Sequence, residues 1–259
     1  MSSATRIPIL MYHRVGAPES RRDIYCIHPG HFAAHMHTLA NAGYQAVTAD
    51  AFEAWLAGTQ ALPDNSFVLT FDDGFMGVHD HALPVLKSLG WPATVFLVAS
   101  KIGQQSDWQV TTQYAMPPHP LMGTDELHRV QAGGFSLQSH SLQHHDLTTL
   151  APDALARDLA ESRTRIADLC GVAPRHLAYP YGRYNAQVAA AAAAAGFSLA
   201  FSVDSGFNAP AQDRYRIRRL DVFGSDSPSM LLRKIQFGTN DGSVGQLARY
   251  YLRRMLQRA

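Results

Sequence analysis

Cysteine is scarce in this chain of 259 residues, which contains only Cys26 and Cys170. Two cysteines cannot build a disulfide framework, and no CxxC pair indicates a cysteine-ligated metal. No stretch approaches the roughly 18 consecutive apolar residues that a membrane-spanning helix requires. The first fifteen residues also lack the apolar segment and the small-residue cleavage site of a secretory signal. From these absences we expect a soluble, cytoplasmic protein.

Neither sign of charge dominates, because 22 Lys and Arg residues face 21 Asp and Glu residues. A protein that neutralises many phosphates carries a basic stripe, so we expect no nucleic-acid partner. Hydrophobic residues make up 46% of the chain, which excludes disorder and suffices for a sizeable core. Since α/β barrels of this length often form one unit, we expect a single domain over residues 1–259.

Apolar runs with strand character alternate with segments of helical periodicity along the whole chain. The expected strands are 7–12, 45–48, 66–71, 93–99, 135–139, 176–179, 197–203 and 216–222. The expected helices are 31–43, 51–57, 79–89, a short one from 124, 151–170, 185–195, 228–235 and 246–258. This alternation predicts parallel strands covered by helices. No linker divides the chain, so the fold class we predict is α/β, a single distorted (β/α)7-type barrel.

Polar residues follow several of the expected strands, at the barrel end where chemistry is expected. His13 follows the first strand, Asp72 and Asp73 follow the strand at 66–71, and His140 and His144 follow the strand at 135–139. Two histidines with one carboxylate form a common ligand set for a catalytic divalent ion. One helical turn would place His140 and His144 on the same face.

Of the adjacent carboxylates Asp72 and Asp73, only one can conveniently reach the ion. The other is free to act as a base and deprotonate a water molecule, because a bound metal ion lowers the pKa of that water. Taken alone, an HxxxH pair is usually a surface feature and Asp-Asp-Gly is usually a turn. Their shared position at strand ends favours a catalytic metal site.

These residues resemble a known family. The motifs TFDDG at 70–74, HSLQH at 140–144 and YPYG at 179–182 are similar to those of the polysaccharide deacetylases of carbohydrate esterase family 4, the NodB homology domain. The resemblance implies a distorted barrel and metal-dependent removal of N- or O-acetyl groups. It further implies that Asp72 is the general base and that Asp73, His140 and His144 bind the metal, which we expect to be Zn²⁺, with Co²⁺ or Ni²⁺ as alternatives. Tyr181 would donate its backbone N–H to the oxyanion.

The chain departs from the family pattern at three places. The arginine that many members carry before Pro-Tyr-Gly is absent at 178–179, and the Asp-Trp motif retains only Asp204. No histidine follows His176 to act as the general acid. However, LMYHRV at 10–15 is similar to the start of a circularly permuted subgroup related to poly-N-acetylglucosamine deacetylases. This similarity implies that His13 is the acid. Asp204 or Asp221 is a candidate to hold its ring or to tune its pKa.

The polar loop expected over 101–123 is long enough to be a functional lid. Its Trp108 could stack on a sugar or simply pack against the protein, and we expect it, with Tyr179 and Pro180, to bind the substrate. Four other histidines are expected on the solvated face of the first helix, at positions 28, 31, 35 and 37.

Three functions are compatible with these residues. The first is a hydrolase that removes acetyl groups from an N-acetylated poly- or oligosaccharide. The second is a deacylase of a cytoplasmic or lipid-linked saccharide intermediate, since the basic helix expected at 246–258 could contact an anionic membrane surface. The third is an inactive carbohydrate-binding barrel, supported by the missing arginine and Asp-Trp pair. Retention of Asp72 beside three metal ligands favours an active enzyme.

Overall fold

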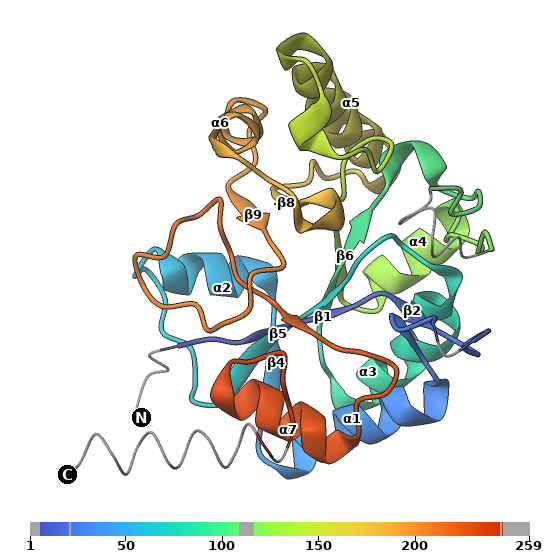
Figure 1. The fold of residues 1–259 in the computed structure, drawn as a ribbon, viewed down its shortest axis with the longest axis vertical. Helices are drawn as coiled ribbons and strands as arrows, with labels where there is room; N and C mark the ends of the chain where they lie inside the picture. The colour runs from blue at the N-terminus through green and yellow to red at the C-terminus, as the bar shows by residue number, and fades with distance from the viewer. Residues whose placement is uncertain (1–5, 21, 109–116, 244, 246–259) are drawn as a thin grey trace.

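A central parallel sheet organises the molecule, and helices surround it (Figure 1). The computed structural model describes residues 6–20, 22–108, 117–243 and 245. The strands of this sheet are β1 (Ile9–Tyr12), β4 (Gln45–Val47), β5 (Ser66–Phe71), β6 (Ala93–Leu97), β7 (Phe135–Ser139), β8 (His176–Ala178), β9 (Leu199–Phe201) and β10 (Leu220–Asp221). Their order is β10-β1-β5-β6-β7-β8-β9, and β4 pairs with the first half of β5.

The helices are α1 (Pro29–Asn41), α2 (Ala49–Leu56), α3 (Leu83–Leu89), α4 (Thr124–Ala132), α5 (Pro152–Cys170), α6 (Ala186–Ala194) and α7 (Pro228–Phe237). Local sequence explains several of their ends. The side chain of Ser227 accepts a hydrogen bond from the Met230 amide at the start of α7, as an N-cap residue does. Gly90 ends α3 with a φ of 65°, a conformation that glycine adopts without strain.

The sheet curls because the segment 217–221 contacts β9 at one edge of the sheet and β1 near the other. Ile217 forms a bridge with Phe201 of β9, and three residues later Leu220 pairs with Leu10 of β1. All six residues of β5 are buried, as expected for a parallel strand covered on both faces. The result is a parallel half-barrel with surrounding helices, in agreement with the predicted fold class.

Several predicted boundaries are corrected. The first strand begins at Ile9, because Ile7 pairs instead with Asn208 in an antiparallel bridge. The helix expected at 79–89 is divided into a π-helical turn, Val78–Ala82, and α3. Pro84 explains the division because it has no N–H to continue the α-helical pattern.

Two other features differ from the sequence prediction. A separate pair of short parallel strands, β2 (Arg14–Val15) and β3 (Cys26–Ile27), was not predicted. The helix expected at 246–258 lies outside the described residues. No helix of the described chain is long and apolar enough to cross a membrane.

Candidate metal centre and active site

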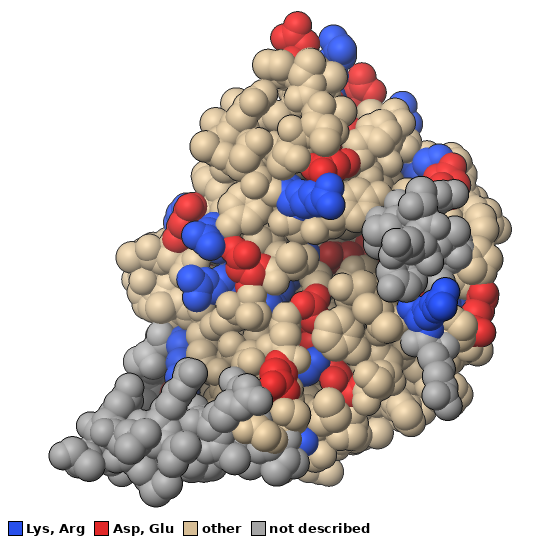
Figure 2. Space-filling view, viewed as in Figure 1, with Lys and Arg blue, Asp and Glu red and all other residues tan. Residues whose placement is uncertain are grey.

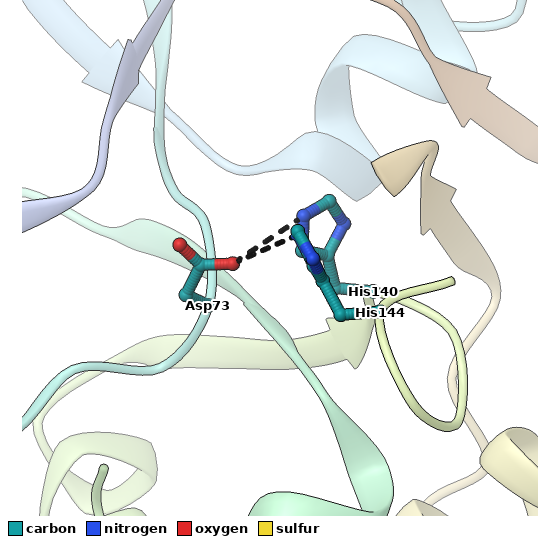
Figure 3. A group of neighbouring side chains, drawn as sticks. All are labelled: Asp73, His140 and His144. Atoms are coloured by element: carbon teal, nitrogen blue, oxygen red, sulfur yellow. Dashed lines mark ion pairs between the residues drawn. The ribbon is translucent and has the colours of Figure 1, made fainter. Parts of the chain in front are cut away.

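The carboxyl ends of β5 and β7 bring three predicted metal ligands together (Figure 3). The Oδ1 atom of Asp73 lies 3.6 Å from Nε2 of His140 and 3.3 Å from Nε2 of His144. All three side chains are buried. Each offers one donor atom to the same small space.

The two histidines converge through a loop, so the prediction of a helical turn between them is wrong. Ser141 and His144 adopt left-handed conformations, with φ of 69° and 60°. The Ser141 hydroxyl accepts a hydrogen bond from the His144 amide at 3.0 Å and thereby holds the loop closed. His140 uses its Nδ1 to contact the carbonyl of Ala178 at 2.8 Å, so its Nε2 is the atom directed at Asp73.

The chemistry of these three residues fits a divalent cation. The Oδ1 atom of Asp73 is buried without a hydrogen-bond partner among the described residues, and burial together with the charge of Asp72 raises its pKa. Burial lowers the pKa of His140 and of His144, which leaves both imidazoles neutral. The unpartnered oxygen of Asp73 therefore faces two imidazole nitrogens, and one oxygen with two nitrogens is a ligand set that zinc accepts.

Asp72 forms a buried ion pair with Arg219. The guanidinium donates to both carboxylate oxygens of Asp72, at 2.6 and 2.8 Å, and its Nε donates to the carbonyl of Ser202 at 2.9 Å. Burial alone would raise the pKa of Asp72, but Arg219, followed by His140 and His13, lowers it to about 2. Asp72 is therefore ionised at neutral pH.

Arg219 was missed in the sequence. It comes from the segment just before β10 and pairs with Asp72, whereas no arginine is present at 178–179. The available signal was a charged residue inside the expected strand 216–222, since a buried arginine requires an acidic partner.

His13 follows β1 and lies near Asp72, whose negative charge opposes the effect of burial on the imidazole. Burial dominates and lowers the pKa of His13 to about 4. Its buried Nδ1 has no hydrogen-bond partner among the described residues. The expectation that Asp204 or Asp221 holds this ring is corrected, because Asp204 instead accepts from Tyr184 and Arg216. The side chain of Asp221 contacts Asn240.

Aromatic rings cover the metal-ligand candidate His144 from two directions. Trp108 stacks on it with 4.6 Å between ring centroids, and Tyr181 approaches edge-on at 4.5 Å. Tyr181 has a φ of 57°, an uncommon conformation for a residue with a side chain. The ring of Tyr179 is fully buried and its hydroxyl donates to the carbonyl of Tyr215, while Pro180 is also buried. Tyr179 therefore contributes to the wall of the cavity, and Pro180 is buried beside it, so neither offers an exposed binding surface.

A cavity of about 660 Å³ opens over these residues. A second hollow, of about 560 Å³, shares Trp108, His144 and Tyr181 with it and is otherwise lined largely by polar and charged side chains. Figure 2 shows that basic and acidic side chains are interspersed over this face. The candidate centre thus lies between two depressions, one of which contains His13 and Asp72.

A second carboxylate and histidine group lies at the amino end of β8. The acidic Asp50 and Glu53 approach His176 there. Glu53 is already paired with Arg175 at 2.9 Å and Arg214 at 3.4 Å, and its hydrogen bond from His176 contributes most to lowering its pKa to about 2. These cations compensate the charge of the carboxylate, so an ion-pair cluster accounts for the group without a metal ion.

His35 corrects the expectation of a solvated histidine face on α1. Its side chain is completely buried, its Nδ1 contacts the Tyr12 hydroxyl at 3.0 Å, and its Nε2 contacts the Asp226 carbonyl at 2.7 Å. His28, His31 and His37 are exposed, as expected.

The fold agrees with the comparisons to known proteins. The sequence profile of the family described as polysaccharide deacetylase matches residues 59–200, more than half of the chain. The chain therefore belongs to the polysaccharide deacetylase family, which confirms the resemblance found in the sequence.

Three individual proteins illustrate the relationship. YxkH of Bacillus subtilis, whose name places it among polysaccharide deacetylases, is 28% identical over 225 residues, which cover 87% of this chain and 73% of YxkH. The poly-beta-1,6-N-acetyl-D-glucosamine N-deacetylase of Staphylococcus epidermidis is 28% identical over 171 residues, or 62% of this chain and 55% of that protein. The structure of the Streptococcus pyogenes deacetylase PplD in complex with acetate superposes on this chain with a TM-score of 0.77 and 22% sequence identity. The superposition covers 90% of this chain and 99% of the PplD chain. This last likeness confirms the barrel fold.

Proposed function

We propose that this protein is a metal-dependent hydrolase that removes acetyl groups from N-acetylated sugar residues of a poly- or oligosaccharide. The products are acetate and a free amine. One observation carries the proposal: donor atoms of Asp73, His140 and His144 converge beside the ionised carboxylate of Asp72 at one cavity. The S. epidermidis relative, whose name specifies an N-acetylated glucosamine polymer, supports this substrate class.

Asp73, His140 and His144 would hold the divalent ion, for which we expect Zn²⁺, with Co²⁺ or Ni²⁺ as alternatives. Such an ion, when bound, polarises the acyl carbonyl and lowers the pKa of water. The rings of Trp108 and Tyr181 pack on His144 and restrict its orientation.

The remaining residues divide the proton transfers between them. Asp72 accepts a proton from the attacking water, and Arg219 keeps this carboxylate ionised until then. As the water oxygen bonds to the acetyl carbon, negative charge develops on the carbonyl oxygen, where the backbone N–H of Tyr181 donates a hydrogen bond. His13 gives a proton to the sugar nitrogen as the carbon–nitrogen bond breaks. The negative charge of Asp72 opposes the effect of burial, but the pKa of His13 is still lowered to about 4, so His13 must gain the proton that it delivers in the course of the reaction.

The alternative of an inactive barrel loses one of its two supports. It rested partly on the missing arginine at 178–179, and Arg219 forms the bidentate ion pair with Asp72 that this arginine would have made. The arginines that suggested a membrane-bound substrate lie beyond the described residues.

The test is acetate release from N-acetylglucosamine oligomers by protein stripped of metal with a chelator and then given Zn²⁺ or Co²⁺. We expect release only with metal, and a loss of about 100-fold or more in Asp72→Asn and His13→Ala. Asp50→Asn is the matched carboxylate control, because Asp50 is exposed and lies in the ion-pair cluster at β8. Full activity of the stripped protein would refute the metal dependence, and unaltered activity of Asp72→Asn would refute the role of that base.

A further inference from the structure

We infer that Tyr25 is the positioning residue for His13, and that its ring orients the imidazole in place of a carboxylate. The inference rests on the proposed function, because it concerns how the proposed proton donor is held. A catalytic histidine is commonly oriented by an acidic side chain that accepts a hydrogen bond from Nδ1. In this protein the buried Nδ1 of His13 has no such partner among the described residues.

Packing must therefore set the direction of the His13 ring. The ring of Tyr25 lies against it, with 4.5 Å between centroids and 41° between planes. This separation is at the short end of the range for interacting aromatic rings. On its other side Tyr25 contacts Phe223, with centroids 5.6 Å apart. His13, Tyr25 and Phe223 thus form a row of rings, and the first two of them line the cavity.

The backbone fixes both ends of this row. The carbonyl of Tyr25 accepts the amide of Arg14, the residue that follows His13, at 3.3 Å. The carbonyl of the preceding residue, Ile24, accepts the amide of Gly224 at 2.8 Å. Tyr25 is therefore tied to β2, which begins directly after His13, and its neighbour Ile24 is tied to the segment that carries Phe223.

Gly224 makes this close approach feasible. A Cβ atom at this position would lie 2.0 Å from the carbonyl oxygen of Cys26, a distance that no side chain permits. Behind the row, Nζ of Lys234 lies 4.5 Å from the centre of the Phe223 ring. Lys234 is itself buried and paired with Asp226 at 2.5 Å, so the support behind Phe223 is rigid.

Tyr25 is 37% exposed, so its ring could instead serve as a platform for the sugar. The two roles have different kinetic consequences. A lost platform weakens substrate binding and raises KM, whereas a misdirected proton donor lowers kcat. The need for a proton donor also depends on the bond that breaks. An amine must be protonated as it departs from the acetyl carbon, whereas the 4-nitrophenoxide of an aryl acetate departs as an anion.

The experiment measures kcat and KM of the metal-loaded protein on N-acetylglucosamine oligomers and on 4-nitrophenyl acetate. We expect Tyr25→Leu to lose about 10- to 100-fold in kcat on the oligomers with KM unchanged, since small displacements of a catalytic group have effects of this size. Its rate on the aryl ester should equal that of the wild type. Tyr25→Phe keeps the ring and should retain both activities.

Three results would overturn the inference: a raised KM with unchanged kcat, an equal loss on both substrates, or no effect of Tyr25→Leu on an active wild type. If Tyr25→Leu fails to fold, Phe223→Leu removes the support behind the ring and should give a smaller loss of the same kind. A wild type that hydrolyses no oligomer would instead refute the proposed function, and this inference with it.

Discussion

At the scale of single residues, the site depends on charges that are held away from water. Arg219 is completely buried and Asp72 nearly so, and each would be costly without the other. The pair was not predictable from local sequence, because 147 residues separate its members. Four other residues could be predicted because an apolar strand ends at or shortly before each of them. They are Asp72 and Asp73 after β5, and His140 and His144 after β7.

Replacing Arg219 by methionine should raise the pKa of Asp72, because burial would remain while the strongest compensating charge is lost. Asp72 would then be protonated at higher pH, so the acidic limb of the kcat/KM profile should move toward neutral pH. The unpaired buried carboxylate should also cost about 3–5 kcal/mol of unfolding free energy. A pH profile and urea unfolding measure the two effects.

Arg216→Met is the matched control for this prediction. Arg216 belongs to the same segment, but its side chain is half exposed and pairs with Asp204. Its profile should coincide with that of the wild type. An unmoved acidic limb in the Arg219 variant would contradict the role assigned to this arginine.

At the scale of elements, strands and helices follow the hydrophobic pattern, whereas the short loops of the site do not. The strands at Ser66–Phe71 and Phe135–Ser139 have the predicted bounds. The left-handed residues Ser141, His144 and Tyr181 carry no sequence signal, since none is glycine. Their conformations are imposed by hydrogen bonds and packing from other segments, so a helical turn was predicted where a loop occurs.

Two glycines of similar backbone conformation test how closely these loops are packed. Gly182 follows Tyr181 and has a φ of 66°, and a Cβ atom there would lie 2.2 Å from the Val203 side chain. Gly182→Ala should therefore displace the Tyr181 turn and lower both the melting temperature and acetate release. Gly90 has a φ of 65° but open space around it, so Gly90→Ala should cost only about 1 kcal/mol and leave activity intact. Equal effects of the two substitutions would contradict the packing argument.

At the scale of the whole molecule, the two ends of the sheet serve different purposes. The candidate catalytic residues lie at the carboxyl ends of the strands. Glu53 and His176 lie at the amino end of β8 and join α2 to the sheet. The barrel type of fold could be predicted because strands and helices alternate, but the bridge from Ile217 to Phe201 could not, since a single bridge leaves no periodic pattern.

Glu53→Gln should lower the unfolding free energy by about 1–3 kcal/mol without changing kcat. The pKa of Glu53 is lowered to about 2 from an ordinary value of 4.5, so the stability it contributes is complete above that ordinary value. This stability is lost as the pH falls through about 2. Urea unfolding between pH 7 and pH 2 should therefore show a smaller loss on acidification in the variant than in the wild type. A changed kcat at pH 7 would show that the two ends are coupled.

The pairing of β1 with β5 has a consequence for how such an enzyme can diversify. Tyr12 pairs with Phe71, and the amide of Asp72 donates to the carbonyl of Tyr12 at 2.9 Å. His13 and Asp72 each follow one of these paired residues, so the spacing between strands, about 4.8 Å, governs the separation of their backbones. Loops around the cavity can lengthen, shorten or change in composition without altering that separation. Changes in these loops can therefore alter which substrate fits while the proposed proton donor and acceptor keep their arrangement.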